Sequence, residues 1–195
     1  MTAPLSGGPI VGVLLAAGSA SRFGGGKLLA PLEDGMPLGL RALVNLVPGV
    51  DRAIVVVRFG DEALARALSN RGADVTICPY AANGMGQSLA WAIRATPLAK
   101  AWVVALADMP WIETATIRRV AEAVERGADL VAASHRGARG HPVGFSRRYY
   151  AELAALSGDE GARAIVRAHE HDIELVETED AGISRDVDTP ADLAR

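Results

Sequence analysis

The chain has 195 residues, half of them hydrophobic and 22% charged, which is ordinary for a soluble globular protein and sufficient for one domain spanning residues 1–195. Its net charge of −3 gives no reason to expect a nucleic-acid partner or an anionic membrane surface. Because no apolar run is long enough to cross a bilayer and the single Cys78 cannot form an internal disulfide, we expect a cytoplasmic protein without a membrane partner.

The first organised segment is an apolar, uncharged run at Ile10–Ala17, which is typical of a strand buried on both faces of a parallel sheet. It leads into a loop from Gly18 to Lys27 that contains four glycines, two serines and the cations Arg22 and Lys27. Glycines let backbone N–H groups turn toward an anion, and the two cations add fixed positive charge. The loop is therefore predicted to bind phosphate.

Two better-known phosphate loops do not fit this segment. A Walker A loop needs Ser or Thr after the Gly-Lys pair, and here Leu28 follows Lys27. The G-x-G-x-x-G dinucleotide fingerprint is also absent from the turn. A flexible surface loop without a ligand is the alternative reading.

Strand-like and helical patterns then alternate along the chain. Strands are expected at Ala53–Val57, Val75–Cys78, Ala101–Leu106 and Asp129–Ala133. Helices are expected at Leu38–Val47, Asp61–Asn70, Met85–Ala95 and Thr114–Arg126. This alternation predicts an α/β fold, a three-layer Rossmann-like domain with a mostly parallel, mixed sheet.

The last third of the chain has a different pattern. Arg147–Leu156 and Asp159–His169 are predicted to be helices. The alternating run Ile173–Val176 and the segment Gly182–Leu193 form a tail that is expected to add edge strands and close the active face.

Two acidic positions are candidates for a metal site. Asp108 follows a predicted strand at the edge where parallel sheets bind ligands, and Mg²⁺ prefers one or two carboxylates with phosphate oxygens. The alternative is that Asp108 caps the helix that begins near Thr114. Asp186 and Asp188 lie on the same side of an extended segment, or else Asp188 caps a following helix.

Asn83–Leu89 opens a predicted helix with two glycines, so its free N–H groups could bind a ligand or simply form a turn. Gly140-His141-Pro142 follows Gly137 and Arg139, and this pattern suggests a mobile basic loop that meets an anionic substrate. A structural role for His141 is the competing interpretation.

Taken together, these motifs resemble the nucleotidyltransferases that move NMP from an NTP. Ala17, Gly18, Arg22, Gly24 and Lys27 fill the pattern A-A-G-x-x-x-R-x-G-x-x-K. Asp-Met-Pro at 108–110, G-M-G-x-S-L at 84–89 and D-x-D-T-P-x-D-L at 186–193 follow in the family's order. Gly-His-Pro-x-x-Phe at 140–145 and LAALSGDEGAR at 153–163 resemble its molybdenum cofactor cytidylyltransferase branch.

The resemblance implies transfer of CMP from CTP, or another NTP, to a molybdopterin-type acceptor, with Mg²⁺ as cofactor and possible delivery of the product to a molybdenum hydroxylase. It implies catalytic roles for Arg22, Lys27 and Asp108, and a magnesium site on Asp108 with Asp188 favoured over Asp186 as second ligand. It implies a pterin side at Gly140, His141 and Pro142. The implied nucleotide-binding residues are Ala16, Ala17, Gly18, Ser19, Arg22, Gly24, Lys27, Gly84, Met85, Ser88 and Asp108.

Other activities stay open at this point. The same chemistry could use GTP or a different acceptor. The chain could instead be a non-enzymatic chaperone that handles the molybdenum cofactor, or a reductase of a quinoid pigment, an activity assigned to some family-like chains.

Overall fold

A seven-stranded mixed sheet, in the order β3-β2-β1-β4-β6-β5-β7, forms the centre of the computed structural model, which describes residues 7–19 and 22–194. Every strand runs parallel to its neighbours except β6, which is antiparallel to both β4 and β5. The strands are β1 (Ile10–Ala16), β2 (Arg52–Arg58), β3 (Asp74–Cys78), β4 (Ala101–Leu106), β5 (Leu130–His135), β6 (Ala138–Ser146) and β7 (Ile173–Glu177). This sheet confirms the predicted α/β fold.

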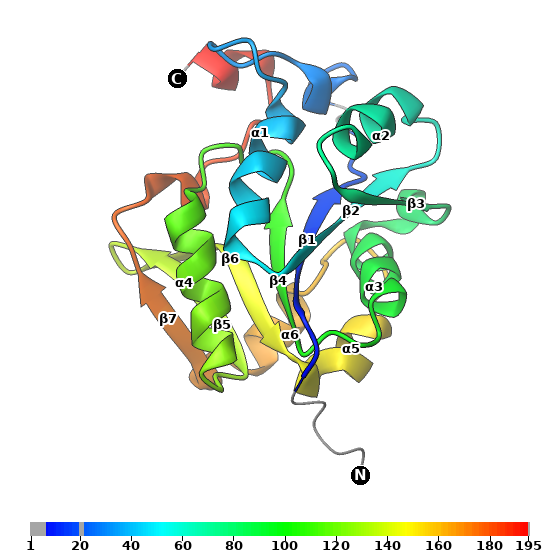
Figure 1. Cartoon of the computed structure of the whole chain (residues 1–195). Helices are drawn as coiled ribbons and strands as arrows, with labels where there is room; N and C mark the ends of the chain where they lie inside the picture. The colour runs from blue at the N-terminus through cyan, green and yellow to red at the C-terminus, as the bar shows by residue number, and fades with distance from the viewer. Residues whose placement is uncertain (1–6, 20–21, 195) are drawn as a thin grey trace.

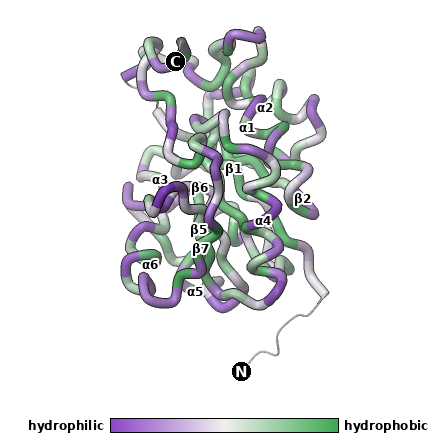
Figure 2. Tube along the Cα trace, turned by 90° about the vertical axis from the view of Figure 1, so that its left-hand side faces the viewer, coloured by the Kyte–Doolittle hydropathy of each residue, from purple (hydrophilic) through white to green (hydrophobic). Residues whose placement is uncertain are grey.

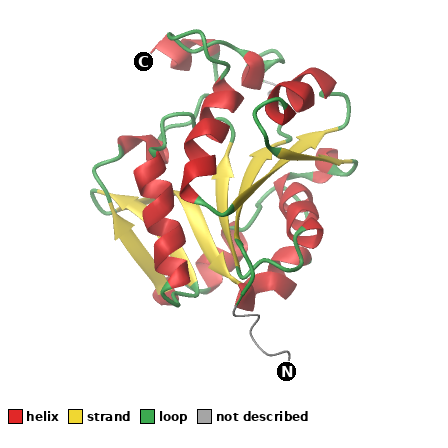
Figure 3. Cartoon of the chain, in the orientation of Figure 1, coloured by secondary structure: helices red, strands yellow, loops and turns green. Residues whose placement is uncertain are grey.

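Helices cover both faces of the sheet (Figures 1 and 3). They are α1 (Leu38–Leu46), α2 (Glu62–Ser69), α3 (Met85–Ala95), α4 (Thr114–Glu125), α5 (Tyr150–Ala154) and α6 (Arg163–Ala168). Alternate residues of β1 belong to different hydrophobic clusters, as the pleat of a strand requires. Leu14 clusters with residues of α1, α2 and α4, whereas Val13 clusters with residues of α3, α5 and α6.

The interior is apolar because both faces of the central strands are covered, and Figure 2 shows hydrophobic segments along the strands with hydrophilic segments at the periphery. Within the described part of the chain, no helix combines the length and the hydropathy needed to span a bilayer.

Strand β6 corrects the prediction of a mobile loop before His141. Residues 138–146 form a strand between β4 and β5, and only the turn at Arg136 and Gly137 lies outside it. The pairing with β5 shifts register between Ala132 and Ala133, which leaves His141 and the cis-linked Pro142 in a bulge. Glycine and proline within this segment hide the strand pattern in the sequence.

The two helices predicted after β6 are shorter than expected. A 3-10 turn at Arg147–Tyr149 precedes α5, and α6 begins only at Arg163. Gly158 and Gly161 have φ angles of 70° and 58°, so the chain turns sharply where the sequence pattern predicted a helix start. Of the edge strands expected in the tail, β7 is confirmed, since it pairs with β5 at the end of the sheet. The segment Gly182–Leu193, all of which the structure describes, forms 3-10 turns and no strand.

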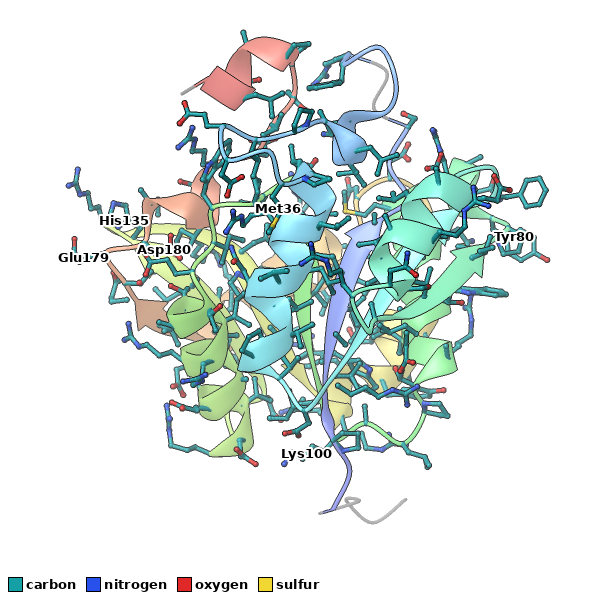
Figure 4. The ribbon with its side chains drawn as sticks, turned by 45° about the horizontal axis from the view of Figure 1, so that its top comes forward. Met36, Tyr80, Lys100, His135, Glu179 and Asp180 are labelled. Atoms are coloured by element: carbon teal, nitrogen blue, oxygen red, sulfur yellow. The ribbon has the colours of Figure 1, made fainter. Side chains whose placement is uncertain are left out.

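A buried carboxylate fastens the C-terminal segment to the start of α4. Asp180 is only 5% exposed, and it accepts hydrogen bonds from the backbone N–H groups of Glu113 and Gly182 and from the hydroxyl of Thr116, at 2.8, 2.9 and 2.8 Å. It therefore holds the residue before α4 and the side chain of Thr116 in the first turn, at the helix start that Asp108 was alternatively expected to cap. Figure 4 labels Asp180 beside its neighbour Glu179.

We expect Asp180→Ala to lower the free energy of unfolding by about 2–4 kcal/mol, because two N–H groups and a hydroxyl lose a charged acceptor. Urea unfolding followed by circular dichroism measures this loss. Glu179→Ala is the matched control, since Glu179 is exposed and should change stability little. Equal stability of the two variants would contradict the role of Asp180 as a fastener.

Candidate functional site

A cavity of about 470 Å³ opens at the carboxyl edge of the sheet. In Figure 1 the chain after β1 and the C-terminal segment both lie above this edge, opposite the N-terminus. Its walls come from segments that follow β1, β2, β3 and β4. The lining residues are Leu15, Ala16, Ala17, Gly18, Ser19, Lys27, Leu28, Arg58, Phe59, Cys78, Pro79, Ala81, Ala82, Gly84, Met85, Ser88, Leu106, Asp108 and Asp159.

Most residues predicted to bind nucleotide line this one cavity. They are Ala16, Ala17, Gly18, Ser19, Lys27, Gly84, Met85, Ser88 and Asp108. Arg22, Gly24 and Asp188 lie outside its lining, as do Gly140, His141 and Pro142. The cavity thus brings together the glycine-rich loop, the start of α3 and Asp108, which are distant in the sequence. The predicted pterin side at residues 140–142 lies outside the cavity lining.

Lys27 is directed into the protein by the glycine-rich loop. Gly24, Gly25 and Gly26 have φ angles of 87°, 95° and 64°, which side chains other than glycine rarely adopt. After this turn the ammonium group of Lys27 donates hydrogen bonds to Oδ2 of Asp108 at 2.9 Å and to the carbonyl of Val187 at 2.7 Å. Lys27 is only 9% exposed, so its charge is balanced inside the site.

The C-terminal segment meets the end of β4 at the same point. The backbone N–H of Val187 donates to the carbonyl of Asp108 at 2.9 Å. One residue further on, Oδ2 of Asp188 pairs with Nη1 of Arg22 at 2.8 Å, in an exposed ion pair. The two acidic segments, which the sequence alone could not connect, therefore meet beside both cations of the glycine-rich loop.

His141 lies beside this acidic region. Burial lowers its pKa, and this effect outweighs both a hydrogen bond with the backbone of Val104 and the negative charge of Asp108, while Arg163 lowers the pKa further. Its Nδ1 atom is buried and has no hydrogen-bond partner among the described residues. The negative charge of Asp186 also raises the pKa of His141, by less than the other causes.

The glycines at the start of α3 allow close packing of another loop. The N–H of Gly86 donates to the carbonyl of Gly158 at 2.8 Å. A Cβ atom on Gly84 would lie 2.3 Å from the backbone of Gly158, and one on Gly86 would lie 2.6 Å from the carbonyl of Ser157. These glycines are thus required by chain packing, whatever they also contribute to a ligand.

Several residues that line the cavity were not predicted from the sequence. Arg58 is the last residue of β2 and Phe59 follows it, and Cys78, Pro79 and Ala81 lie at or just after the end of β3. The rule that ligands bind beyond the carboxyl ends of parallel strands would have pointed to all of them. No motif drew attention to the end of β2.

The carboxylates of Asp108 and Asp188 are oxygen donors of the type that Mg²⁺ or Mn²⁺ accepts, and phosphate oxygens commonly complete such sites. Across residues 7–19 and 22–194, no group of three or more His, Cys, Asp or Glu side chains is arranged to hold a metal ion.

The family model of the MobA-like NTP transferase domain matches residues 12–173 of this chain. The purine catabolism protein PucB of Bacillus subtilis is 30% identical over 193 residues, covering 93% of this chain and 92% of PucB. The nicotine blue oxidoreductase of Paenarthrobacter nicotinovorans is 27% identical, with 95% of each chain covered. The molybdenum cofactor cytidylyltransferase of Escherichia coli is also 27% identical, with 93% of this chain and 92% of that protein covered.

Solved structures of similar sequence have the same fold as this chain. The crystal structure of Rv0371c from Mycobacterium tuberculosis superposes with a TM-score of 0.85 at 30% identity, covering 100% of this chain and 98% of that one. Its complex with manganese gives a TM-score of 0.79 at 29% identity, with coverage of 96% and 97%. The match to this domain and the likeness to these structures identify an enzyme of the nucleotidyltransferase class. The chain belongs to the family of MobA-like NTP transferases.

We expect Gly84→Ala to lower the free energy of unfolding by about 2–4 kcal/mol, because the new methyl group meets the Gly158 backbone and Gly84 has a φ of 109°. Thermal unfolding measures the loss. Gly18→Ala is the matched control in the same cavity, since a Cβ there meets nothing within 4 Å. If both variants unfolded alike, the packing role of Gly84 would be refuted.

Proposed function

We propose that this enzyme transfers CMP from CTP to molybdenum-loaded molybdopterin, giving the cytosine dinucleotide form of the cofactor and pyrophosphate. The observation that carries the nucleotidyl transfer is the convergence of Lys27, Asp108 and the start of α3 on one cavity. The choice of CTP and of the pterin acceptor is supported by the 27% identical cytidylyltransferase of Escherichia coli.

The reaction requires charge neutralisation more than proton transfer. An oxygen of the acceptor's phosphate monoester forms a bond to the α-phosphorus of CTP, and the bond from that phosphorus to the bridging oxygen of the β-phosphate breaks. Pyrophosphate leaves with the charge of that oxygen. Because a phosphate monoester is already largely ionised near neutral pH, no general base is needed, and Arg22 and Lys27 would neutralise the triphosphate.

Asp108 and Asp188 would hold the metal ion, which we take to be Mg²⁺. Both are carboxylates, and the hydrogen bonds between Val187 and both Asp108 and Lys27 keep their segments together. When bound, the metal would stabilise the charge that develops on the transferred phosphate.

Lys27 would have to change partners during this cycle. Its ammonium group now balances Asp108 at 2.9 Å. A triphosphate that enters the cavity offers it a more highly charged partner, and Asp108 is then free to bind a cation. The short loop of Gly24, Gly25 and Gly26 would permit this small displacement.

The remaining predicted residues have roles in recognition. Gly84, Met85 and Ser88 would contact the base and ribose, together with Ala16, Ala17, Gly18 and Ser19. Gly140, His141 and Pro142 would face the pterin, a role supported by the electrostatic influence of Asp108 on His141. Transfer of the product to a molybdenum hydroxylase stays a prediction from the sequence.

A second candidate is reduction of a quinoid compound, favoured by the 27% identity to nicotine blue oxidoreductase over 95% of both chains. Oxidation of NADPH in the presence of a quinoid pigment would identify that activity. A cofactor chaperone would instead bind the pterin without any turnover.

The decisive experiment incubates the protein with Mg²⁺, the molybdenum-loaded pterin and each of the four NTPs in turn, and measures pyrophosphate. We expect release with CTP and much less with GTP. Release with GTP alone would assign a guanylyltransferase, and no release with any NTP would overturn nucleotidyl transfer to this acceptor.

We expect Asp108→Asn to reduce turnover about 100-fold or more, because the amide retains the shape of the carboxylate and loses the charge that binds the metal. The far-ultraviolet circular dichroism spectrum should be unchanged. Unaltered turnover would refute the metal assignment.

Asp188→Asn and Asp186→Asn separate the two possible second ligands. The former should raise the Mg²⁺ concentration needed for half-maximal turnover, whereas the latter should leave it nearly unchanged. The reverse order would assign the second position to Asp186.

A further inference from the structure

The cavity differs in chemistry between its two sides. Asp108 follows β4, whereas Cys78 and Pro79 lie at the end of β3, and β2 and β1 separate these strands in the sheet. Three strand spacings correspond to about 14 Å. Lys27 and Asp108 make the β4 side charged, while Cys78, Pro79, Ala81 and Ala82 make the β3 side largely apolar. A ligand that fits both sides needs an anionic part and a flat or apolar part.

Phe59 is the largest apolar side chain on this wall that lacks a packing partner in the core. It follows the last residue of β2, is 78% exposed, and belongs to neither hydrophobic cluster of the described residues. Gly60 has a φ of 96°, so the chain turns away directly after the ring. An exposed aromatic ring that lines a cavity provides a surface for another ring.

The cation next to Phe59 is already engaged within the protein. Nε and Nη2 of Arg58 donate to the carboxylate of Asp61 at 2.8 and 3.3 Å. Lys27 is instead paired with Asp108, which lies on a different segment across the site. The side of the cavity best suited to phosphate is therefore the β4 side, which leaves the ends of β2 and β3, with Phe59, for the base.

We propose that Phe59 stacks on the nucleobase of the bound nucleoside triphosphate and supplies a large part of the affinity for the nucleoside. This inference rests on the proposed function, since it assumes that the cavity holds an NTP. Stacking on a phenyl ring accepts any base, because every base has a π-face. Phe59 therefore provides binding strength, and the edge of the base has to be read by other groups, such as Ser88 and the backbone at Gly84.

Tyr80 provides a matched control on the neighbouring segment. It is also aromatic and 54% exposed, but it does not line the cavity and instead contacts Trp91 edge-on, with ring centroids 6.3 Å apart. Figure 4 shows Tyr80 at the edge of the molecule. Removing it tests the general effect of losing an exposed aromatic ring in this region.

The experiment measures binding by isothermal titration calorimetry with two probes, CTP and inorganic tripolyphosphate, each with Mg²⁺ and without an acceptor. Phe59→Ala should weaken CTP binding about tenfold, the loss typical of one stacked base. Its affinity for tripolyphosphate should be unchanged, because that probe carries no base. Phe59→Trp should retain or strengthen CTP binding, and Tyr80→Ala should bind both probes like the unaltered protein.

Each other outcome overturns the proposal. Phe59→Ala binding CTP with unaltered affinity removes the stacking role, and an equal loss for both probes shows a general distortion of the site. If Phe59→Ala and Tyr80→Ala lose CTP affinity equally, the effect is not specific to the cavity wall. If the unaltered protein binds neither CTP nor any other NTP, the proposed function fails together with this inference. If the unaltered protein binds CTP and this binding does not depend on Phe59, the stacking inference fails and the proposed function stands.

Discussion

The buried ammonium group of Lys27 holds the candidate site together. A charge removed from water must be paired, and Lys27 finds its partners in the carboxylate of Asp108 and the carbonyl of Val187. These contacts join the glycine-rich loop, the end of β4 and the C-terminal segment, which are far apart in the sequence. The hydrogen bond from Val187 back to Asp108 closes the arrangement, so none of the three segments can move without disturbing the other two.

This arrangement makes the C-terminal segment a part of the site. Asp180 fastens one end of the segment to the start of α4, and Val187 fastens the other end at Asp108. Between them the backbone passes so close to other segments that only glycine fits, since a Cβ on Gly182 would lie 2.3 Å from the carbonyl of Trp111 and one on Gly140 would lie 2.2 Å from that of Ile183. The position of Asp188 therefore depends on packing well outside the cavity.

Much of this organisation could be predicted from the sequence, because buried parallel strands are recognisable as short apolar runs. The order of elements from β1 to β5 followed from such runs, and the choice of Lys27 and Asp108 as candidate site residues followed from the segments directly after two of them. The structure places these two side chains in contact. Strand β6 could not be predicted in the same way, because its glycines and Pro142 resemble a loop and its identity as a strand depends on pairing with β4 and β5. Asp180 was missed for a related reason, since its partners Glu113 and Thr116 lie more than sixty residues away in the sequence.

The glycines of the sequence motifs have two different structural roles, which the motifs themselves do not distinguish. Gly24, Gly25 and Gly26 have positive φ angles and open space around them, so they serve the path of the loop and leave room for a ligand. Gly84 and Gly86 are also motif glycines, but a side chain at either position would collide with the backbone of residues 157–158. Both kinds occur in segments that line one cavity. A match to a nucleotidyltransferase motif therefore includes glycines with open space around them and glycines required by packing, and only the three-dimensional neighbours of each glycine separate the two.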